Sequence, residues 1–185
     1  MVNYHVCSFY TKNTPYEKEV ELFKKQIEQF KIPYTIIPVE SRGSWVRNVN
    51  IKPEVCLSLF KTINDPILYT DIDSRIQQFP KYLEDFSSYD IVVHYRKGKE
   101  LLSGTIILNH TEATLNIIQN WIQECSLYPD RWDQKNLDAI LKRNSQYKIG
   151  NLPSTYVQIF DLMRNEGVPI IEHFQASRKY KRLIK

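Results

Sequence analysis

The sequence lacks most of the features that mark a secreted or membrane-spanning protein. Its cysteines, Cys7, Cys56 and Cys125, are odd in number and widely spaced, and none forms a pair with metal-ligand spacing. We therefore expect reduced thiols in a cytoplasmic protein. No apolar run approaches the roughly 20 residues that a membrane-spanning helix needs. The first residues also lack the basic and apolar regions of a secretory signal.

An excess of one charge is also missing. The 25 Lys and Arg residues against 21 Asp and Glu give a net charge of +4, which is too small to indicate a nucleic-acid-binding protein. The excess is concentrated in a basic tail, about residues 176–185, which predicts at most a weak attraction to a membrane surface. With only 5 Gly and 9 Pro and no internal repeat, the 185 residues are expected to form a single domain, residues 1–185.

Hydrophobic periodicity predicts alternating strands and helices in the first half of the chain. Strands are expected at 4–10, 34–39 and 67–70, and helices at 14–30 and 53–62, the first with Thr14 as N-cap; the polar segment 41–50 reads as a loop. In the second half, strands at 91–94 and 105–109 flank a loop, and helices at 112–125 and 132–143 precede a short late strand. This order favours an α/β fold with a mostly parallel central sheet flanked by helices.

Two carboxylates directly follow the apolar strand at 67–70. Asp71 and Asp73 stand one residue apart with no Lys or Arg between them. In a parallel sheet, ligands bind beyond the carboxyl ends of the strands. Two unpaired anions would raise each other's pKa, and a hard divalent cation removes that repulsion. The pair therefore predicts a Mg²⁺ or Mn²⁺ site, although one Asp capping a turn beside a solvated one would give the same pattern.

Two further segments in the middle of the chain offer polar groups to a ligand. Ser103-Gly104 precedes an apolar strand, and a glycine lets a backbone approach a ligand closely; a simple turn is the alternative interpretation. Asp133-Gln134 at a helix start offers a carboxylate and an amide, although an N-cap and its neighbour would look the same.

The end of the chain adds a histidine and several cations. A neutral His173 could supply a nitrogen ligand to the same metal ion, and Arg178, Lys179 and Lys181 could meet phosphates. A structural histidine and a solvated basic tail are the alternatives.

Together these motifs resemble the nucleotide-diphospho-sugar transferases of the GT-A fold, and most closely small proteins related to glycosyltransferase family eight. The matching segments stand in the same order over residues 4–182: HVCSFYT, SWVRNVNIKPEVCLSLF, PILYTDIDS, LLSGTIILN, DQKNLDAIL and IIEHF. The resemblance implies a metal-dependent glycosyltransferase that moves a sugar from a nucleotide-diphospho-sugar donor to an acceptor. A metal ion would neutralise the leaving diphosphate.

The resemblance also implies a role for particular residues. The metal ion would be Mn²⁺ or Mg²⁺, and a histidine ligand tilts the choice modestly towards Mn²⁺. A UDP-sugar is the favoured donor, while the acceptor, a glycan, lipid or protein, stays open. The implied donor-binding residues are Tyr10, Thr11, Asn48, Lys52, Asp71, Ser103, Gly104, Arg178 and Lys179, the metal ligands Asp71, Asp73 and His173, and the catalytic residues Asp133 and Gln134.

Two alternative functions are compatible with the same motifs. A haloacid-dehalogenase-like phosphatase also has Asp-x-Asp after an apolar strand, but there the pair usually lies near the N-terminus, whereas here it follows two predicted β-α units. A module of the same fold could instead bind a sugar nucleotide without turnover, and the chain is short for this fold.

Overall fold

The computed structural model describes residues 3–81 and 84–180. The rest of the predicted basic tail, residues 181–185 with Lys181, lies outside the described residues. The helices are α1 (Glu17–Gln29), α2 (Trp45–Val49), α3 (Lys52–Thr62), α4 (Glu112–Leu127), α5 (Asp133–Arg143) and α6 (Ser177–Tyr180). The strands are β1 (His5–Thr11), β2 (Tyr34–Val39), β3 (Ile67–Thr70), β4 (Ser74–Ile76), β5 (Ile91–Arg96), β6 (Glu100–Leu108), β7 (Ile149–Asn151), β8 (Gln158–Ile159) and β9 (Ile171–His173).

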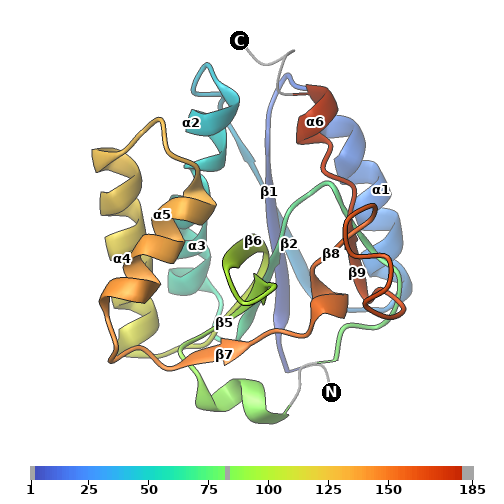
Figure 1. Ribbon diagram of the computed structural model, residues 1–185. Helices are drawn as coiled ribbons and strands as arrows, with labels where there is room; N and C mark the ends of the chain where they lie inside the picture. The colour runs from blue at the N-terminus through green and yellow to red at the C-terminus, as the bar shows by residue number, and fades with distance from the viewer. Residues whose placement is uncertain (1–2, 82–83, 181–185) are drawn as a thin grey trace.

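The central sheet has six strands in the order β2-β1-β3-β6-β5-β7 (Figure 1). Strands β1, β2 and β3 run parallel to one another, as do β5 and β7, whereas β6 is antiparallel to both of its neighbours. The prediction of a mostly parallel sheet flanked by helices is therefore confirmed, with one reversed strand at its centre. Because β6 is reversed, its Gly104 lies beside the end of β3, where the backbone N–H of Asp71 donates to the Gly104 carbonyl at 2.8 Å.

A second sheet of three short strands, in the order β4-β9-β8, lies beside the first. In this sheet β4 pairs antiparallel with β9, so that Ser74 lies opposite His173. The pairing brings a histidine from the end of the chain next to the two aspartates that follow β3. These short strands carry too few residues for a periodicity, and β4, β7 and β8 were not predicted from the sequence.

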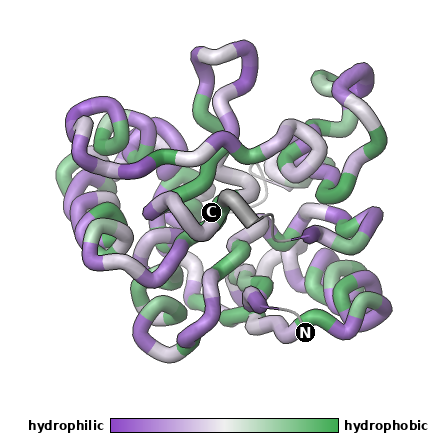
Figure 2. Tube along the Cα trace, turned by 90° about the horizontal axis from the view of Figure 1, so that it is seen from below, coloured by the Kyte–Doolittle hydropathy of each residue, from purple (hydrophilic) through white to green (hydrophobic). Residues whose placement is uncertain are grey.

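The hydrophobic core lies on both faces of the central sheet. On one face it packs against α3, α4 and α5 and includes the fully buried Trp121, and on the other it packs against α1 and includes Phe23. Figure 2 shows hydrophilic and hydrophobic residues alternating along the outer helices, as expected for helices with one covered face. None of the helices in the described ranges is long and apolar enough to cross a membrane.

Three local predictions are wrong. The expected loop at 41–50 contains α2, whose N-cap Ser44 accepts a hydrogen bond from the Arg47 N–H. The expected loop between β5 and β6 is a hairpin, because Lys97 and Gly98 adopt positive φ angles of 51° and 67° and let the strands continue to a tight turn. Thr14 does not cap α1, which begins at Glu17 after Tyr16.

Candidate active site

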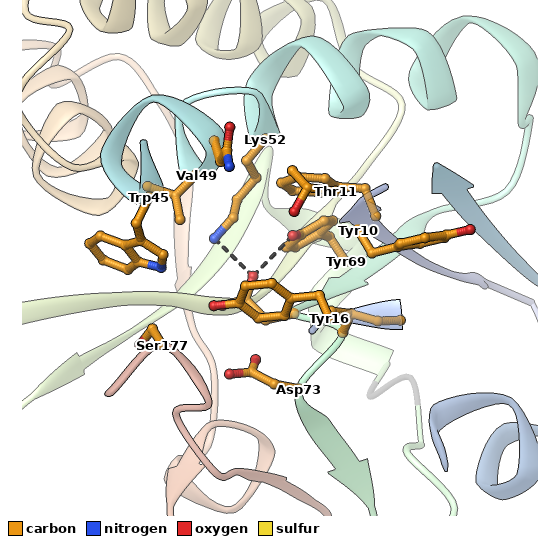
Figure 3. Close-up of a pocket in the computed structure, with 13 residues that line it drawn as sticks. Tyr10, Thr11, Tyr16, Trp45, Val49, Lys52, Tyr69, Asp73 and Ser177 are labelled. Atoms are coloured by element: carbon orange, nitrogen blue, oxygen red, sulfur yellow. Dashed lines mark hydrogen bonds and ion pairs between the residues drawn. The ribbon is translucent and has the colours of Figure 1, made fainter. Parts of the chain in front are cut away.

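The site is a cleft at the carboxyl ends of β1 and β3, made of two adjoining pockets that share Lys52, Asp71 and Asp73. The aromatic pocket, of about 540 Å³ with its solvent-open space, is lined by Phe9, Tyr10, Thr11, Tyr16, Trp45, Asn48, Val49, Lys52, Tyr69, Asp71, Ile72, Asp73 and Ser177 (Figure 3). The polar pocket, of about 990 Å³ counted in the same way, is lined by Trp45, Val49, Lys52, Asp71, Asp73, Leu102, Ser103, Gly104, Trp132, Asp133, Gln134, Val157, Ile159, His173, Gln175, Ser177 and Arg178.

The three predicted metal ligands come together at the junction of the two pockets. One ligand atom each from Asp71, Asp73 and His173 lies within 4.8 Å of the others. The His173 Nε2 atom is hydrogen-bonded to the Thr105 hydroxyl at 2.8 Å, which fixes the ring and leaves Nδ1 on the side of the carboxylates. Two carboxylates and one imidazole form a donor set that suits Mn²⁺ or Mg²⁺.

Gly104 gives this cluster the room that it needs. A Cβ atom added at Gly104 would lie 2.9 Å from Cε1 and 3.0 Å from Nδ1 of His173, and 3.5 Å from Oδ2 of Asp71. Any larger residue at this position would push the imidazole away from the carboxylates. The absence of a side chain at Gly104 thus fits a small ion held between Asp71 and His173.

Burial changes the protonation of two of these ligands. Burial, and then the nearby charge of Asp71, raises the pKa of Asp73 to about 7. Burial, and then the charge of Lys52, lowers the pKa of His173 to about 3, so the imidazole is neutral and able to donate its lone pair. The backbone N–H of Ala176 donates to Oδ2 of Asp73 at 2.7 Å, which ties the C-terminal segment to the cluster.

Lys52 supplies the cation that the sequence around the aspartates does not show. Its side chain is 3% exposed, and Nζ lies 3.0 Å from Oδ1 of Asp71 and 2.9 Å from Oδ2 of Asp133. No Lys or Arg stands between the two aspartates in the sequence, but the start of α3 brings Lys52, a predicted donor-binding residue, to Asp71. Burial opposes the charge on Lys52, but Asp133 and Asp71 outweigh it and raise the Lys52 pKa above its usual value.

The predicted catalytic pair lies on the far side of Lys52, at the start of α5. Oδ2 of Asp133 accepts a hydrogen bond from the Ser103 hydroxyl at 2.9 Å, and Gln134 Oε1 lies 3.4 Å from the Ser103 N–H. The indole N–H of the buried Trp121 donates to the backbone carbonyl of Asp133 at 2.8 Å and fixes the helix start from the core side. Both residues line the polar pocket, and their catalytic role stays a prediction.

Three of the predicted donor-binding residues lie together in the aromatic pocket. Tyr10, Thr11 and Asn48 all line it, and Asn48 Oδ1 accepts the Arg42 N–H at 2.6 Å, which orders the segment before α2. Sequence reasoning missed Tyr16 and Trp45, which flank the pocket in Figure 3. In the sequence Tyr16 shares one apolar helical stripe with Val20, Phe23 and Ile27, and nothing in that spacing sets it apart from a core residue.

The two predicted phosphate-binding cations are placed differently. Arg178 lines the polar pocket, and its Nη1 lies 2.5 Å from Oδ2 of Asp161. Lys179 directs its Nζ over the Tyr180 ring at 5.7 Å and is not among the residues that line either pocket. The structure thus brings Arg178, but not Lys179, to the cleft.

Comparisons with known proteins identify the fold. No model of a protein family matches the sequence, and no curated protein matches it. A glycosyltransferase involved in glycosylation of the major capsid of PBCV-1 has a TM-score of 0.73 and 12% identity, over 93% of this chain and 92% of that one. Crystal structures of LgtC, as an active-site mutant, and GlyE from Streptococcus pneumoniae TIGR4 have TM-scores of 0.60 and 0.61 at 12% and 14% identity.

The coverage differs among these structures. The match covers 92% of this chain and 87% of LgtC, but 94% of this chain and only 55% of GlyE, so the chain spans about half of GlyE's length. These identities are too low to transfer an activity, and family eight is not distinguished from other families. What the comparisons show is that this chain has the fold of the GT-A glycosyltransferases.

Proposed function

We propose that the protein is a metal-dependent glycosyltransferase that uses a nucleotide-diphospho-sugar donor, with a UDP-sugar favoured. The observation that carries the proposal is the cluster of Asp71, Asp73 and His173 at the strand ends, on the border between an aromatic and a polar pocket. A donor has the same three parts in the same order, namely a flat base, a charged diphosphate and a polar sugar.

In this proposal each part of the cleft binds one part of the donor. The aromatic pocket, with Tyr10 and Tyr16, takes the base and the ribose. Asp71, Asp73 and His173 hold a divalent cation, which when bound neutralises the diphosphate as it leaves. The polar pocket takes the sugar, with hydrogen-bonding groups from Ser103 and the Asp133-Gln134 pair.

The chain's own residues prepare the site for charge separation. Lys52 is held between Asp71 and Asp133, so the position of both carboxylates is fixed before a donor arrives. Such preorganised charges need no rearrangement at the moment of reaction, which is why they are effective in catalysis. Arg178 can exchange Asp161 for a phosphate oxygen, since its ion pair lies at the surface and is weak.

A thermal-shift titration tests donor binding. UDP and GDP are added with and without Mn²⁺ to the wild type and to Asp73→Asn. A ligand at a hundred times its dissociation constant stabilises a protein by about 2.7 kcal/mol. We expect a shift with UDP that requires Mn²⁺ and is lost in the variant. No shift with either nucleotide would contradict the proposal.

Two assays separate the remaining candidates. Binding of a UDP-sugar with neither hydrolysis nor transfer would favour the non-catalytic module. Hydrolysis of a generic aryl phosphate that Asp71→Asn abolishes would favour the phosphatase. The fold of the chain does not support the phosphatase alternative, because the solved structures that it resembles are glycosyltransferases.

A further inference from the structure

Trp132 stands out as a large aromatic side chain that remains 42% exposed directly beside the candidate site. It occupies the N-cap position of α5, immediately before Asp133. Its side chain lines the polar pocket on one side. It also lines an outer hollow between α4 and α5, together with Leu127, Tyr128, Pro129, Asp130, Arg131 and Lys135. The indole therefore forms a wall that the two cavities share.

The indole is held in place from several directions although it is exposed. The ring of Trp45 meets it edge-on at 86° with centroids 5.4 Å apart, and the Lys135 Nζ lies 5.5 Å from its centroid. The backbone carbonyl of Trp132 accepts the Asn136 N–H at 3.0 Å in the first turn of α5, which fixes the backbone that carries the indole. An ordered, exposed indole at the rim of a polar cavity is a feature of binding surfaces, because its body is apolar and its edge is polar.

The chemistry of the outer hollow indicates what it binds. Tyr128 and Leu127 are 47% and 63% exposed, and the charged Asp130, Arg131 and Lys135 line the same hollow. The Arg131 guanidinium lies 4.0 Å from the centroid of the Tyr128 ring, so the Trp132 indole is the aromatic surface left for a ligand. A lipid chain needs a continuous apolar lining, which these charges interrupt. A pyranose ring presents apolar C–H groups on its faces and hydroxyls on its edge, so it matches an aromatic face surrounded by hydrogen-bonding groups.

We propose that Trp132 is the stacking surface for a pyranose ring of the acceptor, and hence that the acceptor is a glycan rather than a lipid chain. The inference rests on the proposed function, since it places the acceptor next to the donor sugar. A ring stacked on Trp132 lies beside Asp133 and Gln134, the residues next in the chain, with its edge towards the polar pocket.

Saturation-transfer NMR tests the inference without knowledge of the true acceptor. The probe is a mixture of methyl pyranosides of glucose, galactose, mannose, N-acetylglucosamine and glucuronic acid, added at millimolar concentration to the full chain. We expect saturation of the C–H protons on one ring face of at least one glycoside, reduced about tenfold in Trp132→Ala and retained in Trp132→Phe. Phe79→Ala removes another exposed aromatic ring, one that packs on Phe30, and should change nothing.

The outcomes separate this inference from the proposed function. Equal saturation in wild type and Trp132→Ala, or no saturation in wild type, overturns the stacking surface. UDP binding with Mn²⁺, measured on the same samples, reports on the donor site, and Trp132 does not line the aromatic pocket. A Trp132-dependent sugar signal without UDP binding would support the stacking surface and overturn the donor assignment. Circular dichroism confirms that each variant is folded.

Discussion

Lys52 is the residue on which the electrostatics of the cleft depend. It is almost fully buried and contacts two carboxylates, from the end of β3 and the start of α5. It also donates to the Ser103 carbonyl at 3.1 Å. A buried cation of this kind is tolerated only because its partners replace the lost water.

Replacement of this lysine should destabilise the fold. Lys52→Met leaves Asp133 buried without its cation, and losing one partner of a buried pair costs about 3 kcal/mol. Urea unfolding measures the loss. The double variant with Asp133→Asn should recover part of it, because the uncompensated carboxylate is gone. A double variant no more stable than Lys52→Met would show that packing, and not charge, makes Lys52 important.

Gly104 sets the distance between a metal ligand and its neighbours. Because a Cβ atom there would lie 2.9 Å from the His173 ring, Gly104→Ala must displace the imidazole. We expect a loss of about 1–3 kcal/mol in stability and of Mn²⁺ binding, measured by calorimetric titration. Gly43→Ala serves as a control for metal binding alone, since a Cβ atom at Gly43 meets nothing within 4 Å, while its φ of +83° makes alanine cost stability there too. Unchanged Mn²⁺ affinity in Gly104→Ala would contradict the assigned ligand set.

At the scale of elements, hydrogen bonds between α4, α5 and the loop that connects them form a joint that positions the start of α5 in the site. Glu124 on α4 accepts hydrogen bonds from Arg131 in the connecting loop and from Arg143 at the end of α5. Trp121 on α4 holds the first residue of α5. This joint fixes the direction in which α5 presents its first turn to the cleft.

Glu124 should give this joint a pH-dependent stability. Burial raises the pKa of Glu124, but the hydrogen bonds from the two arginines outweigh burial and lower it below the usual value. The contribution is therefore present above the pKa of the unfolded state and is lost as the pH falls through the lowered folded pKa. We expect Glu124→Gln to cost about 1 kcal/mol at pH 7, as Arg143 is largely exposed, and progressively less as the pH falls below the unfolded pKa and through the lowered folded one. A difference independent of pH in urea unfolding would contradict this origin.

The long elements were predictable, and the short ones were not. The strand at Tyr34–Val39 and the helix from Glu112 follow from apolar spacing, because each is long enough to show a period. The helix α2 covers only Trp45–Val49 and is set by its Ser44 cap, and β4 exists only because it pairs with β9. Pairings of this kind depend on distant parts of the chain and leave no local signal.

At the scale of the whole molecule, the sequence identified the participants of the site but not their connections. Asp71, Asp73 and His173 lie together as predicted, since strand ends and the late strand meet at one edge. The pairing of Lys52 with Asp71 and Asp133 joins residues from three parts of the chain. Trp132 lines the polar pocket only because the start of α5 packs against Trp45 of α2. These relations arise from the tertiary packing of α2, α3 and α5 around the sheet.

Release of UDP tests the central claim most directly. A panel of UDP-sugars is incubated with the protein, Mn²⁺ and a mixture of methyl pyranosides, and UDP and glycosylated products are quantified by mass spectrometry. The account predicts UDP release from at least one donor, with a new glycoside, that depends on Mn²⁺ and falls at least a hundredfold, about 2.7 kcal/mol, in Asp73→Asn. UDP release that is indifferent to Mn²⁺ and to Asp73, or no release from any donor by a protein that binds UDP, would contradict it.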